Sequence, residues 1–208
     1  KGIIDQLKTR NYRFIANSHF TSHLLMQWGI NNQVIYPCLD NIFFQDAQLT
    51  KKNIIFSLGR FFSQLHSKKQ DVLIDTYLQL MQKDKRFLDW QLILAGGLKA
   101  EDNQYFAHLQ QKIKNYPQVK LLPNISFQEL VNLYQQSKLF WHFTGYGIDD
   151  QQQPEKVEHL GIAPLEAMAA GAITFCINAG GPKEIIQDNI NGFLFQSQEE
   201  IISKTIRI

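Results

Sequence analysis

Short apolar runs alternate with segments of helical period from Asn53 onward, and this alternation constrains the fold more than any other feature of the chain. The runs that predict strands are 53–59, 90–97, 119–125, 138–144, 172–178 and 192–195. Helical spacing of apolar residues predicts helices over 71–81, 105–113, 126–134 and 165–171. The S-x-x-E pattern of Ser126 and Glu129 predicts a capping box at the start of the third of these helices. Strands and helices in alternation give parallel strands joined by right-handed crossovers. We therefore expect an α/β fold with a doubly wound, Rossmann-like parallel sheet, whose ligands bind beyond the carboxyl ends of the strands.

The first 42 residues repeat this pattern on a smaller scale. Residues 12–18 and 33–37 read as strands, and residues 19–29 between them read as a helix closed by Gly29. Two strands and one helix are too few to form a core of their own. We therefore expect residues 1–42 to belong to the end of another domain, and residues 43–208 to form the main domain.

Composition narrows the class of protein. The 208 residues are 44% hydrophobic and carry a formal net charge of +2, which fits a globular protein and gives no support for binding nucleic acid. No apolar run approaches the roughly 18 to 20 residues that span a bilayer. Cys38 and Cys176 lie far apart without metal-ligand spacing, so we expect both to be buried and reduced in a cytoplasmic protein. We expect no metal site, because Asp149 and Asp150 do not form a D-x-D motif and are expected to be solvated acids of the glutamine-rich loop at 151–153.

Two acids flank the start of a predicted helix in the segment EHLGIAPLEAMAAG. Pro164 is tolerated in a first helical turn, so we expect the helix to begin between Gly161 and Pro164. The free amides of that turn form an anion site suited to a phosphate. Glu158 and Glu166 flank this site, and an ionised carboxylate can accept hydrogen bonds from two neighbouring sugar hydroxyls. The pattern therefore suits a ligand with a diol on each side of its phosphates, such as a nucleotide sugar.

Cations follow the first strand of the main domain, on the same predicted rim of the sheet. Arg60 comes directly after Gly59, and Lys68 and Lys69 precede the next helix. An arginine fork and a lysine point charge can hold a diphosphate and stabilise the charge that builds on it as a leaving group. Each cation alone is compatible with a solvated loop, and Glu166 alone with a favourable first-turn acid. Their convergence on one rim favours the phosphate–diol site.

At this point the motifs resemble those of a known family. EHLGIAPLEAMAAG, with its E-x7-E spacing, resembles the retaining glycosyltransferases of family 4, and so do NAGGPKEII and NGFLF further on. The resemblance extends upstream through LLPNISFQELVNLYQQS and covers nearly the whole chain. Members of this family have the two-domain GT-B fold. The resemblance implies that the main domain is the C-terminal, donor-binding half, and that the first 42 residues are the end of the acceptor domain and the crossover from it.

The resemblance also implies roles for individual residues. Arg60 and Lys68 would hold the diphosphate and Glu158 would approach the transferred sugar, which makes these three the expected catalytic residues. Lys68 matches the family's lysine, and Lys69 stands where the family has a glycine. The expected substrate-binding residues are Gly161, Ile162 and Ala163 for sugar or phosphate oxygens, Glu166 for the ribose hydroxyls, and Pro123, Asn124 and Ile125 near the base.

The function implied by the resemblance is transfer of a hexose from a nucleotide sugar to a glycan, polysaccharide or lipid-linked acceptor. The sequence motifs EHLGI and GGP resemble those of mannosyltransferases and point to GDP-mannose as the donor. A UDP-glucose-type transferase remains the alternative. No cofactor or metal is expected besides the GDP- or UDP-linked substrate. The acceptor would bind through the N-terminal domain, so this half alone is not expected to transfer sugar. The expected location is the cytoplasm, including peripheral contact with the inner face of a membrane.

Two other classes of protein compete with this interpretation. A dinucleotide-dependent oxidoreductase needs a G-x-G-x-x-G fingerprint after the first strand, and SLGRFF lacks it. A non-catalytic nucleotide-binding or sensing module is compatible with the same site residues and stays open.

Overall fold

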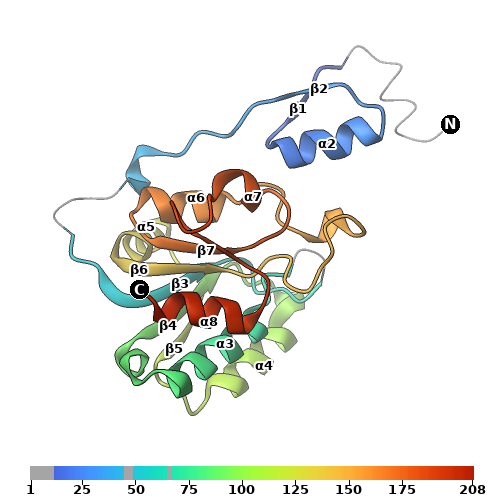
Figure 1. Ribbon diagram of the computed structural model, residues 1–208. Helices are drawn as coiled ribbons and strands as arrows, with labels where there is room; N and C mark the ends of the chain where they lie inside the picture. Colours follow the sequence, from blue (N-terminus) through green and yellow to red (C-terminus); the bar gives the residue numbers. More distant parts are fainter. Residues whose placement is uncertain (1–11, 45–48, 65–66) are drawn as a thin grey trace.

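The computed structural model describes residues 12–44, 49–64 and 67–208, and a parallel sheet of six strands runs through most of them (Figure 1). The strand order is β5-β4-β3-β6-β7-β8, which in order along the chain is 3-2-1-4-5-6, and every neighbouring pair is parallel. The strands are β3 (Lys52–Leu58), β4 (Gln91–Gly96), β5 (Val119–Pro123), β6 (Ser137–His142), β7 (Ile173–Ile177) and β8 (Phe193–Phe195). This order confirms the predicted doubly wound, Rossmann-like sheet.

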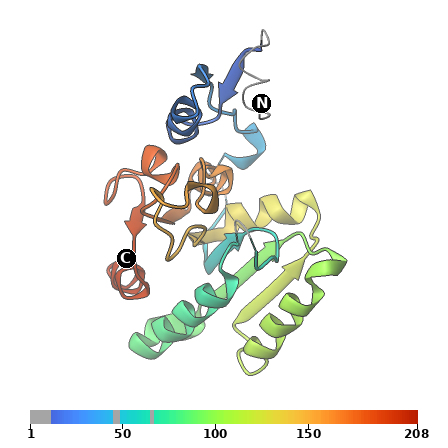
Figure 2. The same cartoon turned by 90° about the vertical axis from the view of Figure 1, so that its right-hand side faces the viewer.

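Helices cover both faces of this sheet (Figures 1 and 2). One face carries α3 (Gln70–Lys83), α4 (Asn103–Ile113) and α8 (Gln198–Ile206), and the other carries α5 (Phe127–Gln136) and α6 (Ile162–Ala169). Successive strand residues point to opposite faces, so Ile55 joins the core under α3 while Ile54 and Phe56 join the core under α5. Burial on both faces explains why the strands read as continuous apolar runs.

The predicted main-domain elements agree with the structure to within a few residues at each end. The capping box predicted from Ser126 and Glu129 is present, because each side chain bonds the other residue's backbone N–H. Helix α8 was not predicted from the sequence, although the same S-x-x-E pattern occurs at Ser197 and Glu200. In α8 Ser197 again accepts a hydrogen bond from the backbone of Glu200, so this local signal was available.

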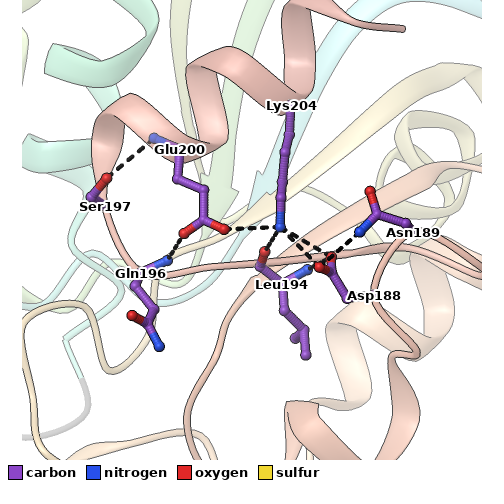
Figure 3. A network of polar contacts seen from close by, with 7 residues as sticks. All are labelled: Asp188, Asn189, Leu194, Gln196, Ser197, Glu200 and Lys204. Atoms are coloured by element: carbon purple, nitrogen blue, oxygen red, sulfur yellow. Dashed lines mark hydrogen bonds and ion pairs between the residues drawn. The ribbon is translucent and has the colours of Figure 1, made fainter.

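A polar network fixes α8 against the strand before it (Figure 3). Lys204 pairs with Asp188 at 3.0 Å and with Glu200 at 2.9 Å, and it also donates to the carbonyl of Leu194 in β8. Asp188 in turn accepts a hydrogen bond from the backbone N–H of Leu194 at 2.8 Å. The Lys204 side chain is only 12% exposed, so little water competes with these partners for its ammonium group.

Residues 12–36, here called the N-terminal unit, form a separate small layer. A two-stranded parallel sheet joins β1 (Phe14–Ala16) to β2 (Asn32–Val34), and α2 (His19–Gln27) connects them. Both views place this unit beside the short helix α7 (Pro182–Ile185), and the chain then crosses to the main sheet (Figures 1 and 2). The crossing ends in the 3-10 helix η1 (Asn41–Phe43), where Phe43 is buried against the rings of Phe127 and Tyr134. The proposed division at residue 42 stays a prediction.

Two expectations about individual side chains were wrong. Cys38 is exposed, because it lies in the extended crossing between β2 and η1, whereas Cys176 in β7 is buried as expected. Asp150, expected to be a solvated loop acid, pairs with Lys183 at 2.6 Å and accepts the backbone N–H of Gly180 at 2.8 Å. Asp150 therefore ties the glutamine-rich loop to the segment that leads into α7.

The described part of the chain contains neither a candidate membrane span nor a candidate metal cluster. None of its helices has the length and apolar character needed to cross a bilayer. No group of three or more His, Cys, Asp or Glu side chains lies close enough to hold a metal ion within residues 12–44, 49–64 and 67–208. The expectation that the protein works without a metal stays a prediction.

Candidate functional site

The residues predicted from the sequence lie near the carboxyl ends of the strands, as expected for a parallel sheet. Arg60 lies two residues beyond the end of β3, and Lys68 lies at the end of the same loop. Pro123 ends β5, and Glu158 lies in the loop between β6 and α6. The parallel topology thus brings residues nearly a hundred positions apart to one rim.

The centre of the site is a cluster around the carboxylate of Glu158. Its Oε2 atom accepts a hydrogen bond from the ammonium of Lys68 at 2.9 Å and one from Nε2 of His142 at 3.0 Å. The side chains of Glu158 and Lys68 are 21% and 25% exposed, and that of His142 is 2% exposed. Because an ionised carboxylate only accepts hydrogen bonds, the proton of the His142 bond lies on Nε2. Glu158 and Lys68, which were predicted to share a site, are therefore in direct contact.

Burial and charge act in opposite directions on this cluster. Burial disfavours the charged form of Glu158, but the hydrogen bonds from His142 and Lys68, together with the positive charge of Lys68, outweigh it and hold the pKa of the carboxyl far below its usual range. Burial lowers the pKa of His142, and the charge of Lys68 adds to that, although the bond to Glu158 opposes it. We therefore describe the cluster as an anionic carboxylate, a cationic lysine and a neutral, donating imidazole.

The backbone around Lys68 explains how it reaches Glu158. A Cβ atom on Gly59 would lie 2.3 Å from Cγ of Lys68, so only glycine at the end of β3 leaves room for the lysine stem. Lys69 has φ 53° and ψ 40°, a left-handed conformation that favours glycine. This is the position at which the family resemblance implied a glycine, so the backbone keeps the glycine-type turn although a lysine occupies it.

Helix α6 begins at the predicted place. Gly161 is its N-cap residue, with φ 102°, and no side chain caps the helix. The first turn contains Ile162 and Ala163, whose amides have no partner one turn back, and Pro164, which has no amide hydrogen. Ile162 is 47% exposed, which keeps this end of the helix accessible. The helix start therefore presents backbone donors and positive dipole beside Glu158.

Glu166, one turn into α6, lies in a different environment. Its Oε2 accepts a hydrogen bond at 2.7 Å from the hydroxyl of Tyr134, which is buried in α5. Burial raises the pKa of Glu166, and the bond from Tyr134 only partly opposes that rise. Tyr134 therefore orients one carboxylate oxygen and leaves Oε1 for another donor.

Arg60 lies apart from both acids and is exposed. Its guanidinium carbon lies 3.8 Å from the centre of the Phe62 ring, a cation–π contact that holds the side chain against the loop. The Arg60 carbonyl accepts a hydrogen bond at 2.9 Å from the side chain of Gln70, which also bonds the carbonyl of Gly59 at 3.3 Å. The loop backbone is thereby fixed, while the guanidinium remains at the surface of the rim.

The loop at Pro123, Asn124 and Ile125 joins the rim through its backbone. Asn124 donates its N–H to the carbonyl of Gly96 at 2.9 Å. Its side chain exchanges hydrogen bonds with both the N–H and the carbonyl of Leu98, at 2.9 and 3.2 Å. Asn124 therefore ties the end of β5 to the loop after β4, and its expected place near a base stays a prediction.

Two side chains that contact the predicted acids, His142 and Tyr134, were not predicted from the sequence. His142 is the last residue of a strand whose carboxyl end faces the site, and this position was the available signal. Tyr134 lies on the buried face of its helix, where a tyrosine needs a partner for its hydroxyl. That requirement was the available signal for a polar contact beneath the site.

A doubly wound sheet with cations, acids and an uncapped helix start on its binding rim is typical of domains that bind phosphorylated ligands. The family model described as "Glycosyl transferases group 1" matches residues 40–208. The chain belongs to this family, which confirms the resemblance found in the sequence.

Comparison with individual proteins gives the same picture. The mouse GDP-Man:Man(3)GlcNAc(2)-PP-Dol alpha-1,2-mannosyltransferase is 28% identical over 203 residues, covering 89% of this chain and 38% of that protein. The Saccharomyces cerevisiae alpha-1,3/1,6-mannosyltransferase ALG2 is 26% identical over 215 residues, covering 86% of this chain and 41% of that protein. The chain thus spans about two fifths of the length of these curated relatives.

Solved structures show the same fold. The crystal structure of Anabaena Alr3699/HepE in complex with UDP-glucose has a TM-score of 0.72 and 24% identity, covering 98% of this chain and 56% of that chain. The crystal structure of TarM has a TM-score of 0.74 and 17% identity, covering 99% of this chain and 38% of that chain. These likenesses support the Rossmann-like half of a two-domain glycosyltransferase as the fold of this chain.

Proposed function

We propose that this chain is the donor-binding domain of a retaining glycosyltransferase that transfers mannose from GDP-mannose to a glycan, polysaccharide or lipid-linked acceptor. The observation that carries the proposal is the Glu158–Lys68–His142 cluster beside the uncapped start of α6, at the carboxyl ends of the central strands. Family membership supports the class of reaction, and the similarity to mannosyltransferases, one of which is named for a dolichol-linked acceptor, favours mannose and a lipid-linked acceptor.

Departure of the nucleoside diphosphate is the step that this site is suited to assist. The exposed guanidinium of Arg60 offers a bidentate fork to phosphate oxygens, and Lys68 has N–H donors beyond the one that faces Glu158. The amides of Ile162 and Ala163 add donors that need no reorganisation. Together these groups neutralise the charge that grows on the diphosphate as its bond to the sugar breaks.

Glu158 is proposed to face the transferred sugar. Its depressed pKa keeps it ionised at neutral pH, so it accepts hydrogen bonds from sugar hydroxyls or stabilises positive charge near the anomeric carbon. The bonds from Lys68 and His142 both go to Oε2, which leaves Oε1 toward the ligand. His142 is therefore a positioning residue that fixes the orientation of the carboxylate.

Glu166 is proposed to bind the ribose hydroxyls through the oxygen that Tyr134 does not use. The raised pKa of Glu166 reflects burial without a cation partner, so a ribose diol would supply the donors that stabilise its charged form. The two acids then hold the two sugars of one ligand, with the diphosphate between them.

Titration calorimetry with GDP-mannose, UDP-glucose, GDP and UDP tests the proposal. We expect GDP-mannose to bind most tightly; tightest binding of UDP-glucose would replace mannose with glucose in the proposal. Glu166→Ala should weaken GDP binding about tenfold, because a charged acceptor is lost. Arg60→Ala should weaken GDP binding more than guanosine binding. Glu155→Gln, which removes an exposed acid outside the site, is the control.

Absence of both variant effects would contradict the residue assignments. Whether turnover occurs is a separate question, because a donor-binding half can bind without transferring. Sugar transfer or donor hydrolysis by the full-length protein separates an enzyme from a non-catalytic nucleotide-binding module. The same assay with excess chelator tests metal independence, and fractionation of cells tests the proposed cytoplasmic location at the periphery of a membrane.

A further inference from the structure

The carboxylate of Glu184 in α7 caps a helix from a distant part of the chain. Its Oε2 accepts the N–H of His19 at 2.8 Å, and its Oε1 accepts the N–H of Phe20. The N-cap residue Ser18 satisfies the next amide of α2, that of Thr21, at 3.0 Å. Glu184 therefore takes up the two helix donors that the local cap leaves free, and its charge lies at the positive end of the helix dipole.

Tyr36 adds a third bond to the same carboxylate. Its hydroxyl donates to Oε2 of Glu184 at 2.7 Å, and this bond, with burial and the charge of Glu184, raises the pKa of Tyr36. Tyr36 lies just beyond β2, so Glu184 contacts the N-terminal unit both at the start of α2 and at the last residue of the unit. A single side chain of the main domain thus binds this unit at two places.

The N-terminal unit also contacts the loop that carries Glu158. The hydroxyl of Ser18 lies 2.6 Å from the carbonyl oxygen of His159 and donates to it. The ring of Phe20 packs against that of His159 with 5.7 Å between centroids. His159 directly follows Glu158, so these contacts act one residue from the acid of the donor site.

The other side of the same backbone is held by the segment that leads to Glu184. Gly181 donates its N–H to the carbonyl of Glu158 at 2.8 Å, and a Cβ atom on Gly181 would lie 2.2 Å from the carbonyl oxygen of His159. The backbone at residues 158–159 is therefore clamped between Ser18 and Gly181. Because Gly181 is three residues before Glu184, one short segment holds both the loop and the N-terminal unit.

We propose that Glu184 is a positioning residue that couples the N-terminal unit to Glu158. Docking of the unit through Glu184 brings Ser18 and Phe20 onto His159, and these contacts fix the backbone from which Glu158 reaches toward the sugar. When the unit separates from α7, the loop loses one of its two supports. This coupling rests on the proposed function only in naming the sugar end of the donor site. Beyond that function, it means that the N-terminal unit controls the sugar end.

Amide hydrogen exchange on Glu184→Gln tests the coupling directly. The neutral amide offers one acceptor in place of two and turns an NH2 group toward the helix donors, so exchange in the first turn of α2 should rise about tenfold. The coupling predicts a parallel rise in residues 157–161. Glu155→Gln, with the same change of charge at an exposed site, should change neither segment. A rise confined to α2 would overturn the proposal, because Glu184 would then only cap a helix.

Ligand binding provides the second measurement. Glu184→Gln should lower the ratio of GDP-mannose to GDP affinity about fivefold, because Glu158 contacts the sugar, while GDP affinity itself stays within twofold. Ser18→Ala should lower the ratio in the same direction without any change in α7, and Glu184→Asp, which keeps the charge, should restore part of it. An unchanged ratio in both Glu184→Gln and Ser18→Ala would overturn the coupling. If the unaltered chain bound neither ligand, the proposed function would fail, and the exchange experiment would still decide the coupling.

Discussion

The carboxylate of Glu158 accepts hydrogen bonds from the ammonium of Lys68 and the imidazole of His142. The carboxylate of Glu166, in α6, accepts one from the phenol of Tyr134. The two acids are half-buried, but their pKa values move in opposite directions. At Glu158 the hydrogen bonds from Lys68 and His142 and the charge of Lys68 outweigh burial, and at Glu166 burial outweighs the single hydrogen bond. Neighbours, and not burial alone, thus decide the direction in which the pKa of a carboxylate on this rim moves.

This difference matches the two ends of the proposed ligand. Near the sugar, where positive charge develops during departure of the diphosphate, the protein supplies an acid that is already ionised and oriented. Near the ribose, which does not react, it supplies an acid whose charged form gains hydrogen bonds when hydroxyl donors arrive. The experiments below break or sharpen this comparison, beginning with the largest expected effect.

The largest effect is expected from removing the charge at Glu158. Glu158→Gln leaves the ammonium of Lys68 beside His142 without its counter-charge, and we expect the free energy of unfolding to fall by about 3 kcal/mol at pH 7. Glu166→Gln should cost far less, because no cation loses a partner there. Urea unfolding monitored by tryptophan fluorescence measures both variants.

A double-mutant cycle identifies the source of that loss. Lys68→Met removes the cation alone, and combining it with Glu158→Gln should recover about 1 to 2 kcal/mol relative to the sum of the single effects. Additive effects would mean that the ion pair contributes nothing and that Glu158 acts through His142 alone.

The second prediction concerns pH. The folded pKa of Glu158 lies below its ordinary value of 4.5, so its contribution to stability is present above pH 4.5 and is lost as the pH falls toward the folded pKa. The folded pKa of Glu166 lies above 4.5, so its contribution is present below pH 4.5 and is lost as the pH rises through the folded pKa. Unfolding free energies at pH 4 and pH 7 should therefore respond oppositely to the two substitutions.

The deficit of Glu158→Gln relative to the unaltered chain should shrink on going from pH 7 to pH 4. The free energy of unfolding of Glu166→Gln, taken relative to that of the unaltered chain, should be higher at pH 7 than at pH 4. The same sign for both variants would show that the two environments do not differ as described.

The third prediction concerns a substitution that removes the hydrogen bond to Glu166 and leaves the hydrogen bonds of Glu158 intact. Tyr134→Phe removes the hydroxyl that bonds Glu166, so the pKa of Glu166 should rise further and nucleoside diphosphate binding should weaken about fivefold, or roughly 1 kcal/mol. The aromatic ring stays, so its packing against Phe56 and Phe43 should remain. Calorimetry with GDP, on Tyr134→Phe and on the unaltered chain, measures the effect.

A matched control comes from the other acid. Because Tyr134 does not contact Glu158, the gain in affinity from adding the sugar, measured as GDP-mannose against GDP, should not change. A loss of that gain in Tyr134→Phe would mean that the two ends of the site are not independent.

Local patterns of the sequence were sufficient to predict most of the fold. Apolar runs ended by glycine gave the strands because both faces of the sheet are buried, and the S-x-x-E pattern at Ser126 gave the start of α5. Parallel topology then placed Arg60, Lys68 and Glu158 on one rim without any knowledge of their contacts. These inferences needed only spacing and the rules of strand connection.

Partners across the fold were beyond the reach of those patterns. The bonds from His142 to Glu158 and from Tyr134 to Glu166 join different elements, and their existence depends on side-chain directions that spacing does not specify. The exposure of Cys38 has the same origin, since burial depends on what covers a residue and not on its type alone. The hydrogen bonds of Ser18 with His159 and of His19 with Glu184 each join residues more than 140 positions apart in the sequence.

The smallest effect is expected at the turn that carries Lys68 to Glu158. Lys69 has a left-handed backbone, which disfavours a lysine by about 1 kcal/mol, and glycine adopts it without strain. Lys69→Gly also raises the entropy of the unfolded chain, so the net gain in unfolding free energy should be only about 0.5 kcal/mol. Asn189→Gly, at a left-handed position far from the site, should gain less because asparagine tolerates this conformation. Urea unfolding compares the two variants, and a loss of stability in Lys69→Gly would show that the lysine side chain itself supports the loop. Because this turn serves only the Glu158 end, Lys69→Gly should leave the pH dependence contributed by Glu166 unchanged.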